Sequence, residues 1–155
     1  MRFSQDRALN LYPHALDALL AECIAECAPR AEARGVELAL DTAPGVVASL
    51  DKHKVKQAIG NLLDNAVDVS PPGSRVDVEA TTGDGRVRIS VRDRGPGVSP
   101  AIRERLFTPF ATTKADGSGL GLTLARELVQ AHGGTLEWQP AEEGTVFVVL
   151  LPRAG

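Results

Sequence analysis

Two asparagines, Asn61 and Asn65, lie one helical turn apart in the segment 55–68. Apolar residues recur in this segment at three- and four-residue spacing, which predicts an amphipathic helix with this apolar side: Val55, Ala58, Ile59, Leu62, Leu63, Ala66 and Val67. We expect the polar residues to fall together on its other side: Gln57, Asn61, Asp64, Asn65 and Asp68. Asn is a poor helix former, but its oxygen can ligate a hard cation and its amide can donate to a phosphate. An ordinary solvated face or a local cap is the alternative interpretation.

A glycine-rich stretch precedes a second periodic segment. Gly117, Gly119 and Gly121 lead into a predicted helix over 120–132, which Gly133 and Gly134 end. Free backbone N–H groups and the positive end of the helix dipole favour an anion at such a start. Lys114, just before it, could be a phosphate cation or, equally, a solvated loop lysine.

Asp93 follows a segment of alternating apolar residues that reads as a buried strand. At the end of such a strand its carboxylate could accept a hydrogen bond from an exocyclic amine, although a plain turn aspartate is the alternative. Gly95 and Gly97 come next, and they would let the backbone pass close to a ligand because neither has a Cβ.

Composition favours one compact domain. The chain has 155 residues, 43% hydrophobic, with a net charge of −3 and no run of Lys or Arg, so nucleic acid is a poor candidate partner. No apolar stretch approaches ~18 residues and no signal peptide is evident, so we expect a cytoplasmic domain without membrane contact. Cys23 and Cys27 could form half a metal site, but no second ligand pair is nearby, and two buried thiols are the better interpretation.

The periodicities predict an α/β two-layer sandwich, in which a mixed, mostly antiparallel sheet of about five strands packs on about three helices. The sheet's other face would be free or covered by a partner. The segment 94–119 has no periodicity and reads as a long, functional loop. The remaining expected elements are a helix over 14–33 ended by Gly35, strands over 36–40 and 46–50, a hairpin of 76–80 and 87–91 with its turn at 83–85, and strands over 135–139 and 145–151.

Four blocks resemble, in order, the N, G1, F and G2 boxes of the ATP-binding catalytic domain of sensor histidine kinases: Asn61–Ala66, Asp93–Gly97, Leu106–Lys114 and Gly117–Leu122. That domain belongs to the GHKL (HATPase_c) superfamily, which also holds gyrase, MutL and the heat-shock chaperone ATPases. The third block is similar to the nitrogen-regulation branch. The match runs from about Leu16 to Pro152, and it implies a Bergerat fold with a long ATP lid at about 94–119.

The resemblance implies binding of ATP or ADP with Mg²⁺. It makes Asn61 and Asn65 catalytic, with Asn65 the magnesium ligand, and makes Asp93 the reader of the adenine amino group. Phe107 and Phe110 would pin or dock the lid. The other implied nucleotide-binding positions are Gly95, Gly97, Lys114, Gly117, Gly119, Leu120, Gly121, Leu122 and Thr145.

Position 61 bears on the reaction. In the gyrase and MutL branches a glutamate there activates water, whereas Asn61 is an amide and no base at neutral pH. We therefore expect ATP to be held for transfer to another nucleophile, with little hydrolysis. Many relatives carry Lys and an aromatic residue where this chain has Asp68 and Val69, so we assign neither a cationic contact nor a stack there. Asp64 or Asp68 could add negative charge near the metal.

We find no phospho-acceptor histidine motif, and residues 1–13 resemble the end of a linker from a missing dimerisation domain, which leaves 14–155 as the catalytic domain. The expected activity is transfer of the γ-phosphoryl group to a His on that separate domain. A response regulator receiver domain would be the further partner, and the chain alone would be monomeric and nearly inactive. The alternatives are a stand-alone serine kinase of the anti-sigma-factor type and a nucleotide-gated docking module that transfers nothing.

Overall fold

The computed structural model describes residues 9–96, 121–141 and 143–153, and every structural statement below concerns these residues. Most of the expected lid falls outside them. Seven of the expected site residues also lie outside the described residues: Gly97, Phe107, Phe110, Lys114, Gly117, Gly119 and Leu120.

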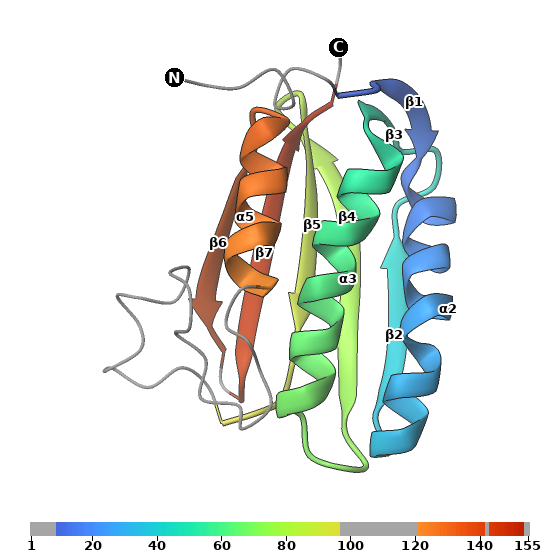
Figure 1. Ribbon diagram of the computed structural model, residues 1–155. Helices are drawn as coiled ribbons and strands as arrows, with labels where there is room; N and C mark the ends of the chain where they lie inside the picture. Colours follow the sequence, from blue (N-terminus) through green and yellow to red (C-terminus); the bar gives the residue numbers. More distant parts are fainter. Residues whose placement is uncertain (1–8, 97–120, 142, 154–155) are drawn as a thin grey trace.

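A five-stranded sheet forms one layer, in the order β2-β4-β5-β7-β6 (Figure 1). Only β2 and β4 run parallel, and the other neighbours are antiparallel. This confirms the expected mixed, mostly antiparallel sheet. Its strands are β2 (Glu37–Thr42), β4 (Arg75–Gly83), β5 (Arg86–Arg92), β6 (Thr135–Pro140) and β7 (Thr145–Pro152).

Three helices cover one face of this sheet (Figure 1): α2 (Leu16–Arg34), α3 (Lys52–Val69) and α5 (Gly121–Ala131). The core lies between the layers, where every second strand residue meets the apolar sides of the helices. Ile59 and Leu62 of α3, and Val78 and Ile89 of the sheet, are all at most 1% exposed. The two-layer sandwich is therefore confirmed, and α3 is its central helix, with α2 and α5 on its flanks (Figure 1).

The start of the domain differs from the prediction. The expected first helix began at His14, but residues Tyr12–Ala15 form a strand, β1, and α2 begins at Leu16. The expected strand over 46–50 exists as β3 (Val47–Leu50), but it pairs with β1 in a separate antiparallel sheet. A strand of four residues carries too little pattern to reveal its partner, and pairing across 32 to 38 positions of sequence is decided by the fold.

Helix α3 has the apolar side that the sequence predicts, because the seven expected residues are its buried residues. The helix begins three residues earlier than expected, at Lys52, after an N-cap at Asp51. The Asp51 side chain accepts a hydrogen bond from the Lys54 N–H at 3.2 Å, as is usual for an N-cap aspartate.

The β4–β5 hairpin confirms the expected turn. Asp84 and Gly85 both have positive φ, 54° and 72°, which is the signature of the tight turn that matches the twist of paired strands. Gly83 and Arg86 flank it as register partners.

Cys23 and Cys27 are free and buried, which confirms their interpretation as thiols inside the domain. Burial raises the pKa of Cys23 to about 11 and that of Cys27 to about 12. Both thiols are therefore neutral at physiological pH and poor nucleophiles. Among the described helices, none is long and apolar enough to cross a membrane.

Candidate functional site

Asn61 lies where α3 meets the start of α5. Its Nδ2 donates a hydrogen bond to the Gly121 carbonyl oxygen at 3.2 Å, and a Cβ on Gly121 would be 3.8 Å from the Asn61 side chain. Asn65 is half-buried one turn further along α3. Leu122, on α5, packs against the core. The fold thus brings together the block Asn61–Ala66 and the end of the block Gly117–Leu122.

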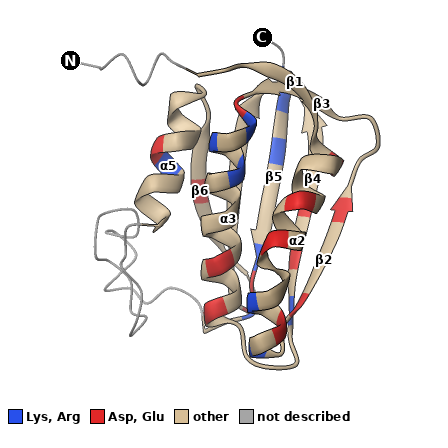
Figure 2. Ribbon diagram, turned by 45° about the vertical axis from the view of Figure 1, so that its right-hand side comes forward, with Lys and Arg blue, Asp and Glu red and all other residues tan. Residues whose placement is uncertain are grey.

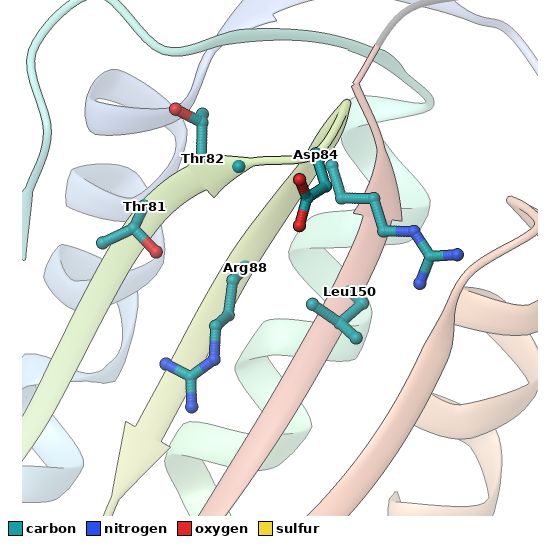
Figure 3. Close-up of a pocket in the computed structure, with 7 residues that line it drawn as sticks. Thr81, Thr82, Asp84, Arg88 and Leu150 are labelled. Atoms are coloured by element: carbon teal, nitrogen blue, oxygen red, sulfur yellow. The ribbon is translucent and has the colours of Figure 1, made fainter.

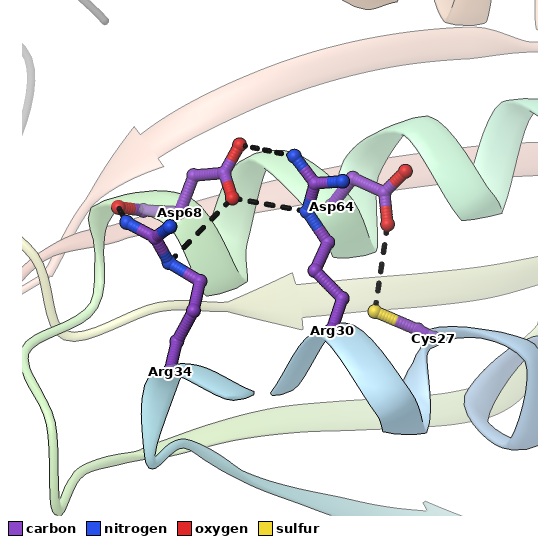
Figure 4. Close-up of polar contacts among 5 residues, drawn as sticks. All are labelled: Cys27, Arg30, Arg34, Asp64 and Asp68. Atoms are coloured by element: carbon purple, nitrogen blue, oxygen red, sulfur yellow. Dashed lines mark hydrogen bonds and ion pairs between the residues drawn. The ribbon is translucent and has the colours of Figure 1, made fainter. Parts of the chain in front are cut away.

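The polar residues of α3 lie together outside its buried apolar side, as expected, but they contact different neighbours. Asp68 forms an ion pair with Arg30 of α2, and Asp64 accepts a hydrogen bond from the Cys27 thiol, also of α2, at 3.5 Å (Figure 4). Asn61 instead contacts α5. Because α3 is the central helix of its layer, its two flanks are covered by different neighbours (Figure 1). A helical wheel of α3 alone cannot separate these two flanks.

Asp93 is buried at the end of β5, with 2% of its surface exposed. Its Oδ1 accepts a hydrogen bond from the Gly95 N–H at 2.9 Å, and its own N–H donates to the Thr145 carbonyl oxygen at 3.0 Å. Thr145 is also buried, at 3% exposed. The pairing of β5 with β7 therefore joins two expected site residues that lie 52 positions apart.

Burial raises the pKa of the Asp93 carboxyl, against the backbone hydrogen bonds of Gly95 and Thr145 and the charge of Arg92, which lower it. Desolvation thus outweighs the stabilisation of the charged form. A carboxylate has about four lone-pair positions on two oxygens, so this group can accept a further donor. A buried acceptor with that capacity favours a ligand that brings an amine to it.

Gly95 is required by a close backbone approach within the protein. A Cβ at this position would lie 2.5 Å from the Val69 carbonyl oxygen at the end of α3. The sequence interpretation gave Gly95 a contact with ligand, and the observed contact is with this helix. Gly144, which sequence reasoning missed, has a φ of 87°, and a Cβ there would collide with the Asp93 carbonyl. Its signal in the sequence is a glycine directly before a predicted strand.

Contacts of Arg94, which the sequence did not single out, fix the chain after Asp93. The Arg94 N–H donates to the Ser70 Oγ at 3.4 Å, next to the end of α3. The Arg94 side chain forms an ion pair with Asp77 of β4 at 2.7 Å and donates to the Arg75 carbonyl. These contacts hold the segment that follows β5 between α3 and β4.

A pocket on the other side of the sheet is not part of this site (Figure 3). It opens near the turn of the β4–β5 hairpin, at the opposite end of β5 from Asp93. Its lining residues are Thr81, Thr82, Gly83, Asp84, Arg86, Arg88 and Leu150. It contains no residue that the sequence analysis singled out for binding.

The chain matches the family model of histidine kinase-, DNA gyrase B- and HSP90-like ATPases over residues 50–155. It is 39% identical over 158 residues to the C4-dicarboxylate transport sensor protein DctS of Rhodobacter capsulatus, covering 97% of this chain and 24% of that protein. It is 37% identical over 160 residues to the swarming motility regulation sensor protein RssA of Serratia marcescens, covering 97% of this chain and 34% of that protein. The chain therefore spans about a quarter to a third of the length of these curated relatives.

Solved structures agree with the fold. The catalytic domain of histidine kinase ThkA, in a nucleotide-free form, superposes with a TM-score of 0.86 at 26% identity, covering 94% of this chain and 97% of that one. Full-length ShkA in complex with AMPPNP superposes with a TM-score of 0.84 at 35% identity, covering 94% of this chain and 32% of that one. The family model covers more than half of the chain, and the resemblance read from its four blocks is confirmed. The chain belongs to the family of histidine kinase-, DNA gyrase B- and HSP90-like ATPases, and its fold is that of a histidine kinase catalytic domain.

Proposed function

We propose that this chain binds Mg-ATP and transfers the γ-phosphoryl group to a histidine on a separate dimerisation domain of a sensor kinase. The observation that carries this proposal is the buried Asp93 carboxylate, which is followed by a segment that packs against the end of α3. The relatives that are named as sensor proteins and the ShkA complex with AMPPNP support it.

The adenine end of the ligand would lie at Asp93. A buried carboxylate gives a directional contact to an exocyclic amine, and an apolar surround gives the base a place to pack. Thr145 stands beside it through the backbone. Of the expected base-binding residues, these two are the ones that tertiary contacts bring together.

The phosphate end would lie at Asn61 and Asn65, where Asn61 contacts the start of α5. Amide oxygens are hard donors that suit Mg²⁺, which takes only one or two protein ligands and completes its shell with phosphates and water. The side-chain oxygen of Asn65 would be that ligand. The Asn61 Nδ2 is already engaged with Gly121, so its oxygen would orient a phosphate-bound or metal-bound water. The bound metal would neutralise the charge of the phosphates during transfer.

Neither asparagine can take a proton from water at neutral pH, so ATP should be held with little hydrolysis. Catalysis would rest on positioning and charge neutralisation, and the imidazole of the acceptor would be the nucleophile. The partners would be the dimerisation domain and a response regulator receiver domain. A neighbouring structure, histidine kinase ThkA in complex with response regulator protein TrrA, supports the second of these. The domain would act in the cytoplasm and would be monomeric when isolated.

Binding is tested by calorimetric titration of ADP with and without magnesium. We expect Asn65→Ala to abolish the magnesium-dependent part of the affinity, because its amide oxygen is the proposed metal ligand. The metal-independent part should stay within about twofold, because the Asn65 oxygen has no metal to bind when magnesium is absent. Gln57→Ala, an exposed position on the same helix, is the matched control. An unchanged magnesium dependence in Asn65→Ala would exclude its role as ligand.

Transfer is tested with labelled ATP and a separately prepared dimerisation hairpin from a relative. Acid-labile label on the hairpin indicates phosphohistidine and supports the proposal. Acid-stable label on a protein substrate would instead indicate a serine kinase. Nucleotide binding without any label would favour a docking module.

A further inference from the structure

A buried carboxylate lies next to the proposed metal-binding asparagine. Asp68 follows Asn65 by three residues on α3, about 4.5 Å along the helix axis, and its side chain is only 7% exposed. This inference rests on the proposed function, because it concerns how that site tolerates negative charge. An uncompensated carboxylate so close to a polyphosphate would repel it, and burial would weaken the screening by solvent.

Two arginines of α2 neutralise this carboxylate (Figure 4). Arg30 contacts both oxygens, with Nε at 3.0 Å from Oδ1 and Nη2 at 2.9 Å from Oδ2. This is the bidentate geometry in which guanidinium–carboxylate pairs are strongest. Arg34 adds its Nε at 3.7 Å from Oδ1 and donates from Nη2 to the Asp68 carbonyl oxygen at 3.2 Å. We call Arg30 and Arg34 on Asp68 the arginine clasp.

In the arginine clasp the acid is on α3 and the cations are on α2, which is the opposite of the other ion pairs between these two helices. At the other end of α3 the cations are on α3, where Lys52 contacts Glu22, and Lys56 contacts Glu22 and Glu26 of α2. At the end near Asn65 the acid is on α3 and the cations are on α2. The nucleotide-facing helix therefore carries negative charge at the place where the proposed ligand is most negative.

Stability alone gives little reason for the clasp. The side chains of Arg30 and Arg34 are 46% and 48% exposed, and ion pairs with one exposed member contribute little to folding. The larger effect is on the electrostatic potential around the buried Asp68 carboxylate, because Arg30 and Arg34 place two positive charges beside it. We propose that Arg30 and Arg34 are positioning residues that neutralise Asp68 and thereby set the affinity of the site for the polyphosphate of the nucleotide.

The test is the variant Arg30→Gln/Arg34→Gln, titrated with Mg-ADP and, separately, with adenosine. Adenosine has no phosphate, so it reports the base site alone. We expect the affinity for Mg-ADP to fall about threefold to tenfold at low salt, and less at high salt, as for a charge effect close to the ligand. The affinity for adenosine should change by less than about twofold, as for a neutral ligand.

A third substitution shows whether the loss of affinity comes from the charge of Asp68 or from damage to the packing of α2 on α3. Adding Asp68→Asn to the double variant removes the uncompensated charge and should restore the affinity for Mg-ADP to that of the parent. Asp68→Asn alone should bind at least as well as the parent. Lys52→Gln/Lys56→Gln is the matched control, because it also removes two positive charges from this helix pair, at positions about 20 Å and about 13 Å from Asn65 along the axis of α3. It should leave both affinities unchanged.

Several results would overturn the inference. One is an equal loss for adenosine and Mg-ADP, and another is failure of Asp68→Asn to restore binding. A third is weaker binding by Asp68→Asn alone, which would make Asp68 itself a ligand. The single variant Arg30→Gln, which keeps Arg34, should show a smaller loss in the same direction and serves if the double variant does not fold. Absence of binding by the parent protein would instead overturn the proposed function.

Discussion

At the residue scale, Asp93 is a buried carboxyl group whose pKa is raised. It is 2% exposed, and burial raises the pKa of its carboxyl although backbone N–H groups and Arg92 act in the opposite direction. A buried acceptor whose charged form is disfavoured costs the protein stability at neutral pH. Such a cost is typical of a group retained for ligand recognition.

We predict that Asp93→Asn weakens Mg-ADP binding about tenfold or more, because loss of a hydrogen bond to a charged acceptor is costly in a buried site. The amide is nearly the same size as the carboxylate, so the sheet should remain intact. Adenosine binding should weaken in parallel, unlike in the clasp variant. Calorimetric titration with both ligands measures this, and parent-like affinity for adenosine in Asp93→Asn would exclude the assigned role.

At the element scale, polar contacts join α3 to α5 and to the segment before β1, at the end of α3 that lies away from Asp93. The Asp51 N–H donates to the His132 Nε2 at 3.1 Å, and the His132 Nδ1 donates to the Leu128 carbonyl oxygen at 2.8 Å. The Asp51 carboxylate accepts from Asn10 and Lys54. One N-cap thus ties the segment before β1 to the start of α3 and the end of α5, which the sequence did not indicate.

We predict that Asp51→Ala lowers the free energy of unfolding by about 1–2 kcal/mol, because it removes an N-cap acceptor. Asp51→Asn should cost less, since Asn is an equally good cap. Burial opposes ionisation of Asp51, but the backbone N–H donors of Asn10 and Lys54 outweigh it, so its pKa is lowered. A lowered folded-state pKa means that the stabilisation is present above the unfolded-state pKa of about 3.9 and is lost as pH falls through the folded-state pKa.

Urea unfolding at pH 7 and near pH 3 checks this prediction. The difference in stability between the parent and Asp51→Ala should narrow at the lower pH. A difference that stays constant would show that the charge of Asp51 contributes nothing to the cap. Asp17→Ala, an exposed acidic residue in the first turn of α2, is the control for general effects of acid.

At the scale of the whole molecule, the proposed site is built from both layers. Asp93 and Thr145 belong to the sheet, whereas Asn61 and Asn65 belong to α3 (Figure 1). Charged residues occur along both α2 and α3 (Figure 2), and ion pairs between them, such as Arg30–Asp68 and Lys56–Glu26, hold the outer helix to the central one. A ligand that contacts both layers should stabilise the folded state as a whole.

We predict that ADP with magnesium raises the melting temperature. At a concentration of about 100 times Kd the linkage adds about 2.7 kcal/mol, which is about 5–10 °C for a domain of this size. Scanning fluorimetry or calorimetry at several ADP concentrations measures this. The shift should be smaller without magnesium and in Asn65→Ala, and an absent shift at saturating ligand would contradict binding to the folded domain.

The sequence by itself determined the helices and strands that have a clear hydrophobic periodicity, and it determined the family of the chain. The apolar side of α3 and the hairpin of β4 and β5 were predicted because each follows from local periodicity and turn chemistry. The four blocks identified the family because their order along the chain is preserved. The expected contacts of these residues with nucleotide remain predictions.

Only the tertiary structure decided which residues and strands contact each other. The pairing of β1 with β3, the contact of Asp93 with Thr145 and the division of α3's polar residues between α2 and α5 all join segments far apart in sequence. Periodicity in the sequence indicates which side of a helix or strand is buried. It carries no information about which other element packs against that side. Asp68 and Asn61 have the same polar signal on the helix, and the packing of α3 between two helices gives one an arginine clasp and the other a place beside Gly121.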